Sequence, residues 1–283
     1  MIGNSKNEIH LDDQELSNLF HEIDQQYGFN FTHYSRASIS RRVIRFMHLN
    51  YMFTLSKLKD ALLNDQSLFE FFIEEVVVNV TEMFRDPFFY KSLRENVFPF
   101  LSTYPHIRIW DAGCATGEEL LSLAIMLEES NLLNRTRIYA TDISQKSLNR
   151  ARSGMVSMSE MPRYEKNYIL AGGHRKLNNY YYVNTINKRN ANFDLNLLKN
   201  VVFYPHNLAS DASFNEFHLI ICRNVLIYFD KVLQEHVLKL FFESLVPLGF
   251  LGLGKKETIY FSESKNSFKI LDKQEKIYRK MVV

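Results

Sequence analysis

A short segment with two glycines followed by two glutamates has the residue types of a ligand-binding loop. Gly113 and Gly117 lie between an apolar run, 107–110, and the start of a helix, and glycines let a ligand approach the backbone closely. Glu118 and Glu119 begin that helix, whose N-terminal amides would otherwise attract a phosphate. The two carboxylates therefore disfavour a dinucleotide pyrophosphate and favour a cationic ligand that lacks phosphate.

S-adenosylmethionine has this charge pattern, because it carries a sulfonium and an ammonium group and no phosphate. We interpret the loop, which includes Ala112 and Gly113, as a binding site for this cofactor. The alternative interpretation of Glu118 and Glu119 is that they only place favourable negative charge at the start of a helix.

Polar residues also follow the later apolar runs. Asp142 ends the run 138–141, and an acidic residue at such a strand end can accept hydrogen bonds from ribose hydroxyls. It could instead cap the helix that starts near Ser144. The segments 206–208 and 222–224 follow further strands. Because ligands bind at the carboxyl ends of strands in open parallel sheets, we expect these polar residues to converge on one crevice.

The alternation of apolar runs and helices in the second part of the chain predicts a mostly parallel sheet with covering helices. The fold class that we expect is therefore α/β, a Rossmann-like domain with a small antiparallel β insertion at about 165–200, preceded by an all-helical N-terminal domain. The expected elements are strands at 107–110, 138–141, 201–204, 217–222 and 250–253, a helix at 231–245, and a closing hairpin within 265–282.

The first hundred residues instead show helical spacing. The first helix has an apolar face with steps of three and four residues, and Asp12 or Asp13 is its expected cap. This face consists of Leu16, Leu19, Phe20 and Ile23. Further helices are expected after Ser35, after Thr54 and across 67–78. The expected domains are 1–80, all helical; 81–105, a linker with connecting helices; and 106–283, the Rossmann-like domain with its insertion.

Composition limits the possible classes of protein. With 283 residues, 46% of them hydrophobic and 23% charged, the chain has room for two domains with full cores. The two cysteines, Cys114 and Cys222, can build neither a disulfide framework nor a cysteine-rich zinc site, and the nine histidines lack metal-binding spacing. We expect no metal. The net charge of +2 shows no general preference for nucleic acid.

No apolar run approaches the roughly 20 residues that a membrane-spanning helix requires. The first 16 residues are polar and acidic, without an apolar stretch behind a basic start, so we expect no export signal. The expected protein is cytoplasmic, is not inserted in a membrane, and is monomeric.

Six motifs, in order along nearly the whole chain, resemble the CheR-type chemoreceptor glutamate methyltransferases. They are Asn79-Val-Thr-Glu-Met-Phe-Arg85-Asp, Asp111-Ala-Gly-Cys-Ala-Thr-Gly-Glu-Glu119, Ala140-Thr-Asp142-Ile, Ala151-Arg-Ser-Gly154, His206-Asn-Leu208 and Cys222-Arg-Asn-Val-Leu-Ile-Tyr-Phe229. The first and the sixth are the most specific. The resemblance implies a helical domain and a β insertion beside a methyltransferase domain, with S-adenosylmethionine as cofactor and S-adenosylhomocysteine as product.

The resemblance also implies roles for individual residues. Arg85 and Tyr228 are expected to face the reacting centre. The expected cofactor contacts are Asn79, Thr81, Arg85, Glu118, Asp142, Asn207, Leu208, Arg223 and Asn224. Taken alone, Arg85 could form a surface ion pair with Asp86, and Tyr228 could be a core residue.

The implied reaction suits these residue types. A glutamate acceptor has an ordinary pKa of about 4.3, so it is already an anionic nucleophile at neutral pH and needs no general base. The forked donors of Arg85 can orient a carboxylate. The expected partner is the cytoplasmic domain of a chemoreceptor or a related signalling protein. Alternatives are a methyltransferase acting on RNA or a small molecule, and a cofactor-binding sensor without turnover.

Two segments depart from the family pattern. The family often has Gly-His-Ser-Glu where this chain has Gly254-Lys-Lys-Glu257, which adds the positive charges of Lys255 and Lys256. The segment 34–42 resembles a branch of the family that is less tied to a receptor tail peptide. Arg41, Arg42 and Arg45 are expected to dock an acidic receptor helix, or alternatively to form a solvated helix face.

Overall fold

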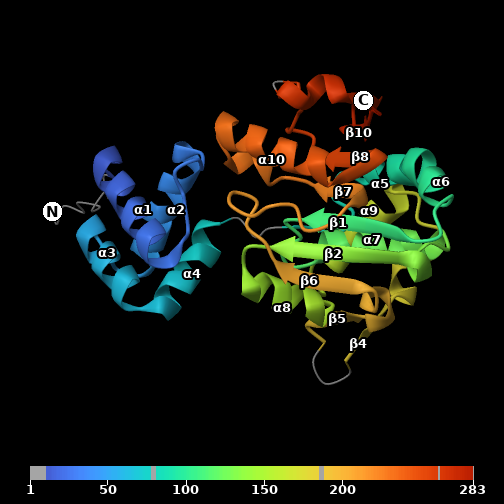
Figure 1. Ribbon diagram of the computed structural model, residues 1–283. Coiled ribbons are helices and arrows are strands. Elements are labelled where there is room, and N and C mark those ends of the chain that lie inside the picture. Colours follow the sequence, from blue (N-terminus) through green and yellow to red (C-terminus); the bar gives the residue numbers. More distant parts are fainter. Residues whose placement is uncertain (1–10, 78–80, 185–187, 261, 283) are drawn as a thin grey trace. The chain divides into compact units, whose positions relative to one another are not determined.

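The computed structural model describes residues 11–77, 81–184, 188–260 and 262–282. Two compact units make up the chain: residues up to 79 with 228–233, and residues 80–227 with 234–283. Helices form most of the first unit (Figure 1). They are α1 (Asp13–Tyr27), α2 (Arg36–Leu49), α3 (Leu55–Asn64) and α4 (Gln66–Val76). The predicted all-helical N-terminal domain is therefore confirmed.

Local signals in the sequence place the starts of these helices. The Asp12 carboxylate accepts hydrogen bonds from the backbone amides of Gln14 and Glu15, and the Thr54 and Asp65 side chains cap α3 and α4 in the same way. The four apolar residues predicted for the first helix are all buried. An aromatic core that includes Phe31, packed against rings of α1 and α4, fills the interior of the unit.

Residues 228–233 belong to this helical unit although they are distant from it in sequence. Tyr34 pairs with Phe229 as an isolated antiparallel bridge, and the backbone amide of Ser35 donates to the carbonyl of Tyr228 at 2.7 Å. The Asp230 carboxylate lies 2.9 Å from Nδ1 of His33. These contacts give the segment after residue 227 its conformation.

The second unit contains a seven-stranded sheet with the order β6-β2-β1-β7-β8-β10-β9. Strands β1 (Ile107–Ala112), β2 (Thr136–Asp142), β6 (Val201–Pro205), β7 (Phe217–Cys222) and β8 (Leu245–Leu253) are parallel, and β9 (Phe268–Asp272) and β10 (Ile277–Lys280) close the sheet as an antiparallel pair. The order of the strands changes direction between β1 and β7. Ligands bind at such a point in doubly wound folds.

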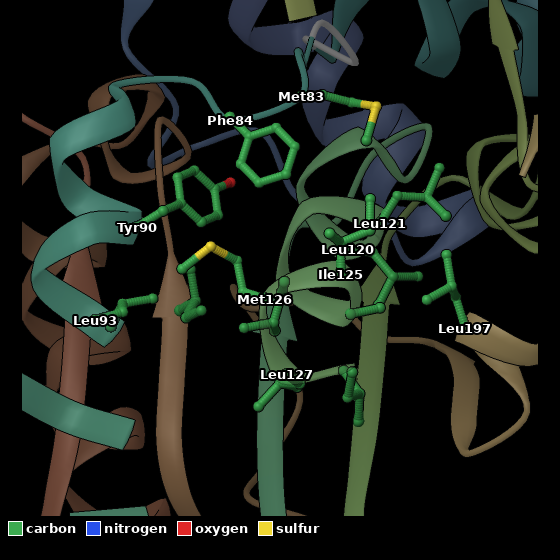
Figure 2. Close-up of a cluster of buried hydrophobic side chains, with 14 of the residues drawn as sticks. Met83, Phe84, Tyr90, Leu93, Leu120, Leu121, Ile125, Met126, Leu127 and Leu197 are labelled. Atoms are coloured by element: carbon green, nitrogen blue, oxygen red, sulfur yellow. The ribbon is translucent and has the colours of Figure 1, made fainter. Parts of the chain in front are cut away.

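Helices cover this sheet (Figure 1). They are α5 (Pro87–Ser92), a π-helical turn (Leu93–Val97), α6 (Phe98–Leu101), α7 (Glu118–Glu129), α8 (Gln145–Ser153), α9 (Met161–Leu170) and α10 (Lys231–Ser244). Short 3-10 turns lie at Leu133–Arg135, Leu177–Asn179, Leu195–Leu198, Leu226–Tyr228 and Glu263–Ser267. Residues 119–127 of α7 are all buried, since they pack on the sheet and under other elements. Figure 2 shows Phe84, Tyr90 and Met126 in the resulting apolar cluster.

The predicted β insertion is a three-stranded antiparallel sheet with the order β3-β5-β4. Its strands are β3 (Met155–Ser157), β4 (Tyr181–Val183) and β5 (Asn190–Phe193). The insertion begins about ten residues earlier than the 165 expected, because β3 follows Gly154 directly and pairs with β5. With the main sheet and the helices, this confirms the predicted Rossmann-like α/β fold.

Candidate active site

The loop after β1 has a backbone that requires its glycines. Gly113 and Gly117 have φ angles of 84° and 95°, in the left-handed region that other residues seldom adopt. A Cβ atom at Gly113 would lie 2.6 Å from Val225, and one at Gly117 would lie 2.7 Å from the Cα of Ala151. Both glycines are therefore needed for close packing of the loop as well as for its turn.

Asp142, at the end of β2, holds this loop in place. Its carboxylate is buried and accepts hydrogen bonds from the amides of Ala115 and Ser144, each at 2.9 Å. Burial raises the pKa of Asp142 against the effect of these hydrogen bonds. The hydroxyl of Ser144 caps α8 by accepting from Ser147, so Asp142 is not the cap of that helix. Its expected contact with ribose hydroxyls stays a prediction.

The two glutamates after the loop have different surroundings. Glu118 accepts a hydrogen bond from the hydroxyl of Thr116 at 2.6 Å, and burial raises the pKa of its carboxyl group. Glu119 is buried within the second unit, and its Oε2 lies 2.7 Å from Nη1 of Arg223. Glu119 is therefore part of a buried ion pair and more than a helix-start charge.

Arg223 follows β7, and its guanidinium is almost completely buried, with 1% of the side chain exposed. Its Nη2 donates to the carbonyl of Arg85 at 2.8 Å and to the carboxylate of Asp86 at 2.7 Å. The guanidinium lies over the ring of Phe89, 4.3 Å from its centre. Both terminal nitrogens are engaged by protein groups, so the cofactor contact expected of Arg223 stays a prediction for its backbone.

Arg85 lies between two residues with unusual backbone angles. Phe84 and Asp86 have φ angles of 51° and 53°. Among the residues that the structure describes, no hydrogen bond or ion pair engages the Arg85 guanidinium, and this residue is partly exposed. The Asp86 carboxylate pairs with Arg223 and Lys255 instead. The alternative ion pair between Arg85 and Asp86 is therefore not formed.

Glu257 organises the segment after Arg223, which the sequence interpretation did not foresee. Its buried carboxylate accepts hydrogen bonds from the amides of Asn224 at 3.0 Å, Val225 at 2.9 Å and Gly254 at 2.6 Å. Burial raises the pKa of Glu257, although these hydrogen bonds oppose the change. Asn224 has a φ of 61°, and its buried Oδ1 has no hydrogen-bond partner among the described residues. It is a polar group well suited to a bound ligand.

The segment that departs from the family pattern has a structural account. A Cβ atom at Gly254 would lie 2.7 Å from Oε2 of Glu257, so Gly254 must be a glycine for Glu257 to reach the backbone. Lys255 lies 3.5 Å from Glu275 and 3.9 Å from Asp86. The added positive charge of Lys255 is thus balanced by acidic neighbours, and Lys256 is exposed.

The remaining predicted cofactor residues of the second unit lie at the same edge of the sheet. Asn207 follows β6, where its amide donates to Asp211 at 2.8 Å, and Leu208 is buried. The amide of His206 donates to the carbonyl of Asp142 at 3.2 Å, which places the start of this turn beside the end of β2. Thr81 is partly exposed, and Asn79 lies outside the described residues.

Asp111 is a further buried carboxyl group beneath the loop that the sequence interpretation did not single out. It is 0% exposed, and neither oxygen has a hydrogen-bond partner among the described residues. Burial, together with the negative charges of Glu119 and Asp142, raises the pKa of Asp111 well above its usual range. The position of Asp111 inside an otherwise apolar strand was the feature of the sequence that could have identified it as a buried carboxyl group.

Tyr228 and the three arginines of the basic cluster belong to the helical unit. Arg41 and Arg45 are exposed on α2, whereas Arg42 is partly buried and lies over the ring of Tyr228, 5.6 Å from its centre. Burial, with the charges of the neighbouring arginines, lowers the pKa of Arg42 despite the opposing effect of Tyr228. The pairing of Tyr228 with Arg85 at the reacting centre stays a prediction.

Within the described ranges, no group of three or more His, Cys, Asp or Glu side chains is arranged to hold a metal ion. In the same part of the chain, no helix is both long and apolar enough to cross a membrane.

The residues at the carboxyl ends of β1 and β7 fit S-adenosylmethionine. Gly113 and Gly117 form a close-packed turn, and the carboxylates of Asp142 and Glu118 bind Ala115 and Thr116 of the same loop. The unpartnered Oδ1 of Asn224 adds a hydrogen-bond acceptor in the segment that packs against the turn. These features suit a cationic nucleoside ligand.

Comparison with known proteins agrees with this geometry. Residues 79–277 match the family described as CheR methyltransferase, SAM binding domain, and residues 14–77 match its all-alpha domain. A Pseudomonas putida protein named methyltransferase Cher3 is 46% identical over 95% of this chain and 97% of its own length. Chemotaxis protein methyltransferases of Borreliella burgdorferi and Salmonella typhimurium are 30% and 28% identical, covering 89% and 87% of this chain and 90% and 84% of their own lengths. The chain therefore belongs to the CheR methyltransferase family and is an S-adenosylmethionine-dependent methyltransferase.

Proposed function

We propose that this protein methylates glutamate side chains in the cytoplasmic domain of a chemoreceptor or a related signalling protein, and that it acts in the cytoplasm. Several relatives carry the name chemotaxis protein methyltransferase. The observation that carries the proposal is the position of Arg85. Its guanidinium has no protein partner among the described residues, while its backbone is tied through Arg223 to Glu119 at the start of α7.

The reaction needs little acid–base chemistry from the protein. When bound, S-adenosylmethionine supplies an electrophilic methyl group on a positively charged sulfur. The glutamate acceptor, with a pKa of about 4.3, is ionised at neutral pH, so no side chain has to remove a proton. Arg85 holds the acceptor carboxylate through its forked donors and aligns one oxygen with the methyl carbon. Tyr228 is the second residue that we assign to the reacting centre.

The cofactor contacts that we propose lie at the carboxyl edge of the sheet and on the preceding segment. They are Asn79, Thr81, Arg85, Ala112, Gly113, Glu118, Asp142, Asn207, Leu208, Asn224 and, through its backbone, Arg223. Glu118 and Asp142 provide the acidic side of this site. Arg85 provides a positive charge for the acceptor.

The helical unit has a separate proposed role. Arg41 and Arg45 are exposed on α2, so they can meet acidic groups of a receptor helix. We assign residues 1–80 to acceptor binding, 81–105 to the connection between the two functions, and 106–283 to cofactor binding and transfer.

Radiolabelled methyl transfer tests this function. Purified protein is incubated with methyl-labelled S-adenosylmethionine and receptor-containing membranes, and the labelled protein is then treated with alkali. Glutamate methyl esters release volatile methanol, whereas methylated nitrogen or RNA retains the label. We expect alkali-labile label with the native chain, and a loss of about 100-fold or more with Arg85→Ala.

A matched control and two alternative outcomes sharpen this experiment. Lys91 is a nearby cation on α5 whose side chain is 50% exposed, and its Nζ lies 3.9 Å from Glu95. Because this exposed pair contributes little, Lys91→Ala should transfer normally. Alkali-stable label would favour the RNA or small-molecule alternative. S-adenosylhomocysteine binding without any transfer to membranes would contradict the proposed receptor acceptor.

A further inference from the structure

We propose that the Arg223 side chain is a positioning residue, which together with Glu119 and Asp86 holds Arg85 in its working conformation. This inference rests on the proposed function, because that function gives Arg85 its contact with the acceptor carboxylate. The resemblance to the family implied that Arg223 contacts the cofactor. The contacts of its guanidinium indicate a different role for the side chain.

The hydrogen bonds of the Arg223 guanidinium connect the Arg85 backbone to α7. Nη2 of Arg223 donates both to the carbonyl of Arg85 at 2.8 Å and to the carboxylate of Asp86 at 2.7 Å. Nη1 donates to Glu119 at 2.7 Å. One buried side chain thus joins the backbone at Arg85 to the second residue of α7. A guanidinium can do this because its donors point in several fixed directions.

The backbone on both sides of Arg85 has an unfavourable conformation. Phe84 and Asp86 lie in the left-handed region, which is unfavourable for residues with a Cβ atom. Such a conformation persists only when its surroundings hold it. Phe84 is held by its buried ring and by a hydrogen bond from its amide to Ser122 at 2.9 Å. Asp86 depends on Arg223, with Lys255 at 3.9 Å as an outer neighbour.

The charge of the Arg223 guanidinium is matched by two acidic neighbours. Two carboxylates, of Glu119 and Asp86, lie against Arg223, and its guanidinium also lies over Phe89. Removing the guanidinium would leave these carboxylates without their buried partner. The carboxylate of Asp86 would then be free to attract Arg85, its neighbour in sequence, and so to withdraw that side chain from the acceptor.

The test uses Arg223→Lys in the full-length protein. Lysine keeps the positive charge but cannot serve Glu119, Asp86 and the Arg85 carbonyl in the same directions. We expect methyl transfer to fall by about 10- to 100-fold, because small misplacements of a positioning group have effects of this size. We also expect Arg223→Lys to have no further effect when it is combined with Arg85→Ala.

A matched control separates positioning from loss of stability. Arg94 forms another buried ion pair in the same unit, 2.6 Å from Glu129. Glu129 is ten residues after Glu119 on α7, or roughly 15 Å along the helix. Arg94→Lys should lower the melting temperature to a similar extent and leave methyl transfer unchanged.

Hydrogen exchange gives a readout that does not depend on activity. We expect amides of the segment 84–86 to exchange faster in Arg223→Lys than in the native protein or in Arg94→Lys. If the native protein yields no glutamate esters, the proposed function fails, whereas the exchange experiment still tests the positioning of this segment. Asp86→Asn, a change at a partly exposed side chain, should show the same faster exchange and tests the idea if Arg223→Lys does not fold.

Three outcomes would overturn the proposal. One is normal methyl transfer by Arg223→Lys. Another is that Arg223→Lys reduces methyl transfer, or the affinity for S-adenosylhomocysteine, by the same factor in the native protein and in Arg85→Ala. The Arg223 side chain would then act on the cofactor directly. The third is unchanged exchange of the segment 84–86 in both Arg223→Lys and Asp86→Asn.

Discussion

Buried carboxylates connect distant parts of the second unit. Glu129, at the end of α7, accepts hydrogen bonds from three residues that are distant in sequence. Its side chain is 1% exposed. It accepts hydrogen bonds from Tyr168, from Tyr180 at 2.9 Å and from Arg94 at 2.6 Å. Burial disfavours the ionised form, but the hydrogen bonds from Tyr168, Arg94 and Tyr180 outweigh it and lower the pKa of Glu129. The ionised carboxylate therefore stabilises the fold.

This pKa shift predicts a pH dependence of stability. The folded-state pKa of Glu129 lies below the unfolded value of about 4.3, so its contribution is present above that value and is lost as the pH falls through the folded-state pKa. We expect Glu129→Gln to lower the free energy of unfolding at neutral pH by about 1–3 kcal/mol. In this variant the free energy of unfolding should also fall less steeply as the pH is lowered. Urea denaturation at several pH values measures both effects. Glu128→Gln is the control, and an unchanged acid slope in Glu129→Gln would contradict the expectation.

Short segments between regular elements carry the proposed site, and buried acids at element ends determine their conformation. Asp142, at the end of β2, binds the amide of Ala115 in the glycine loop. Glu257, after β8, binds the amides of Asn224 and Val225 after β7. In both cases a carboxylate from one strand end holds the backbone that follows a neighbouring strand. The crevice is therefore held by contacts between elements rather than by the preferences of each loop.

We expect Glu257→Gln to weaken cofactor binding. The amide nitrogen of glutamine cannot accept a hydrogen bond, so at least one of the backbone amides at Asn224, Val225 and Gly254 loses its partner. Stability should fall by about 1–3 kcal/mol, and the Kd for S-adenosylhomocysteine should rise about tenfold. Calorimetric titration and urea denaturation measure these changes. Glu263→Gln, at an exposed position, should alter neither, and an unchanged Kd for Glu257→Gln would argue against a role of this segment in cofactor binding.

At the scale of the whole molecule, the helical unit contains two separate stretches of the chain, the N-terminal helices and residues 228–233. The second stretch begins four positions after Asn224 and pairs with Tyr34 through Phe229. Tyr228 lies within it, under Arg42 of the basic cluster. One continuous stretch of chain therefore includes a proposed cofactor residue and a residue that contacts the proposed receptor-binding helix.

Charge reversal on α2 tests the role of the helical unit. If Arg41 and Arg45 attract an acidic receptor helix, the double change Arg41→Glu with Arg45→Glu should raise the KM for receptor about tenfold or more. The affinity for S-adenosylhomocysteine should not change, and the effect should diminish at high salt because exposed charges are screened. Lys57→Glu, at an exposed position of α3, is the matched control. An equal rise in KM for Lys57→Glu would show only a general charge effect.

Local patterns in the sequence determined the elements and the glycine loop. Apolar residues spaced three and four positions apart marked the buried face of α1, because the burial of one helix face leaves a periodic pattern. Continuous apolar runs marked the five parallel strands. Gly113 and Gly117 showed where a left-handed turn follows a strand. The resemblance of the six motifs then indicated the family. None of this depended on which distant residues touch.

The tertiary structure alone decided the partners of the charged side chains. Arg223 binds Glu119 and Asp86, which lie 104 and 137 positions away in the chain, and Glu257 binds amides about 30 positions away. The residue types indicate that these buried polar groups need partners. They do not identify the partners, because strand order and register decide which groups come together. The positioning role inferred for Arg223 follows from that spatial arrangement, whereas the expectation of a cofactor site at the carboxyl edge of the sheet followed from sequence.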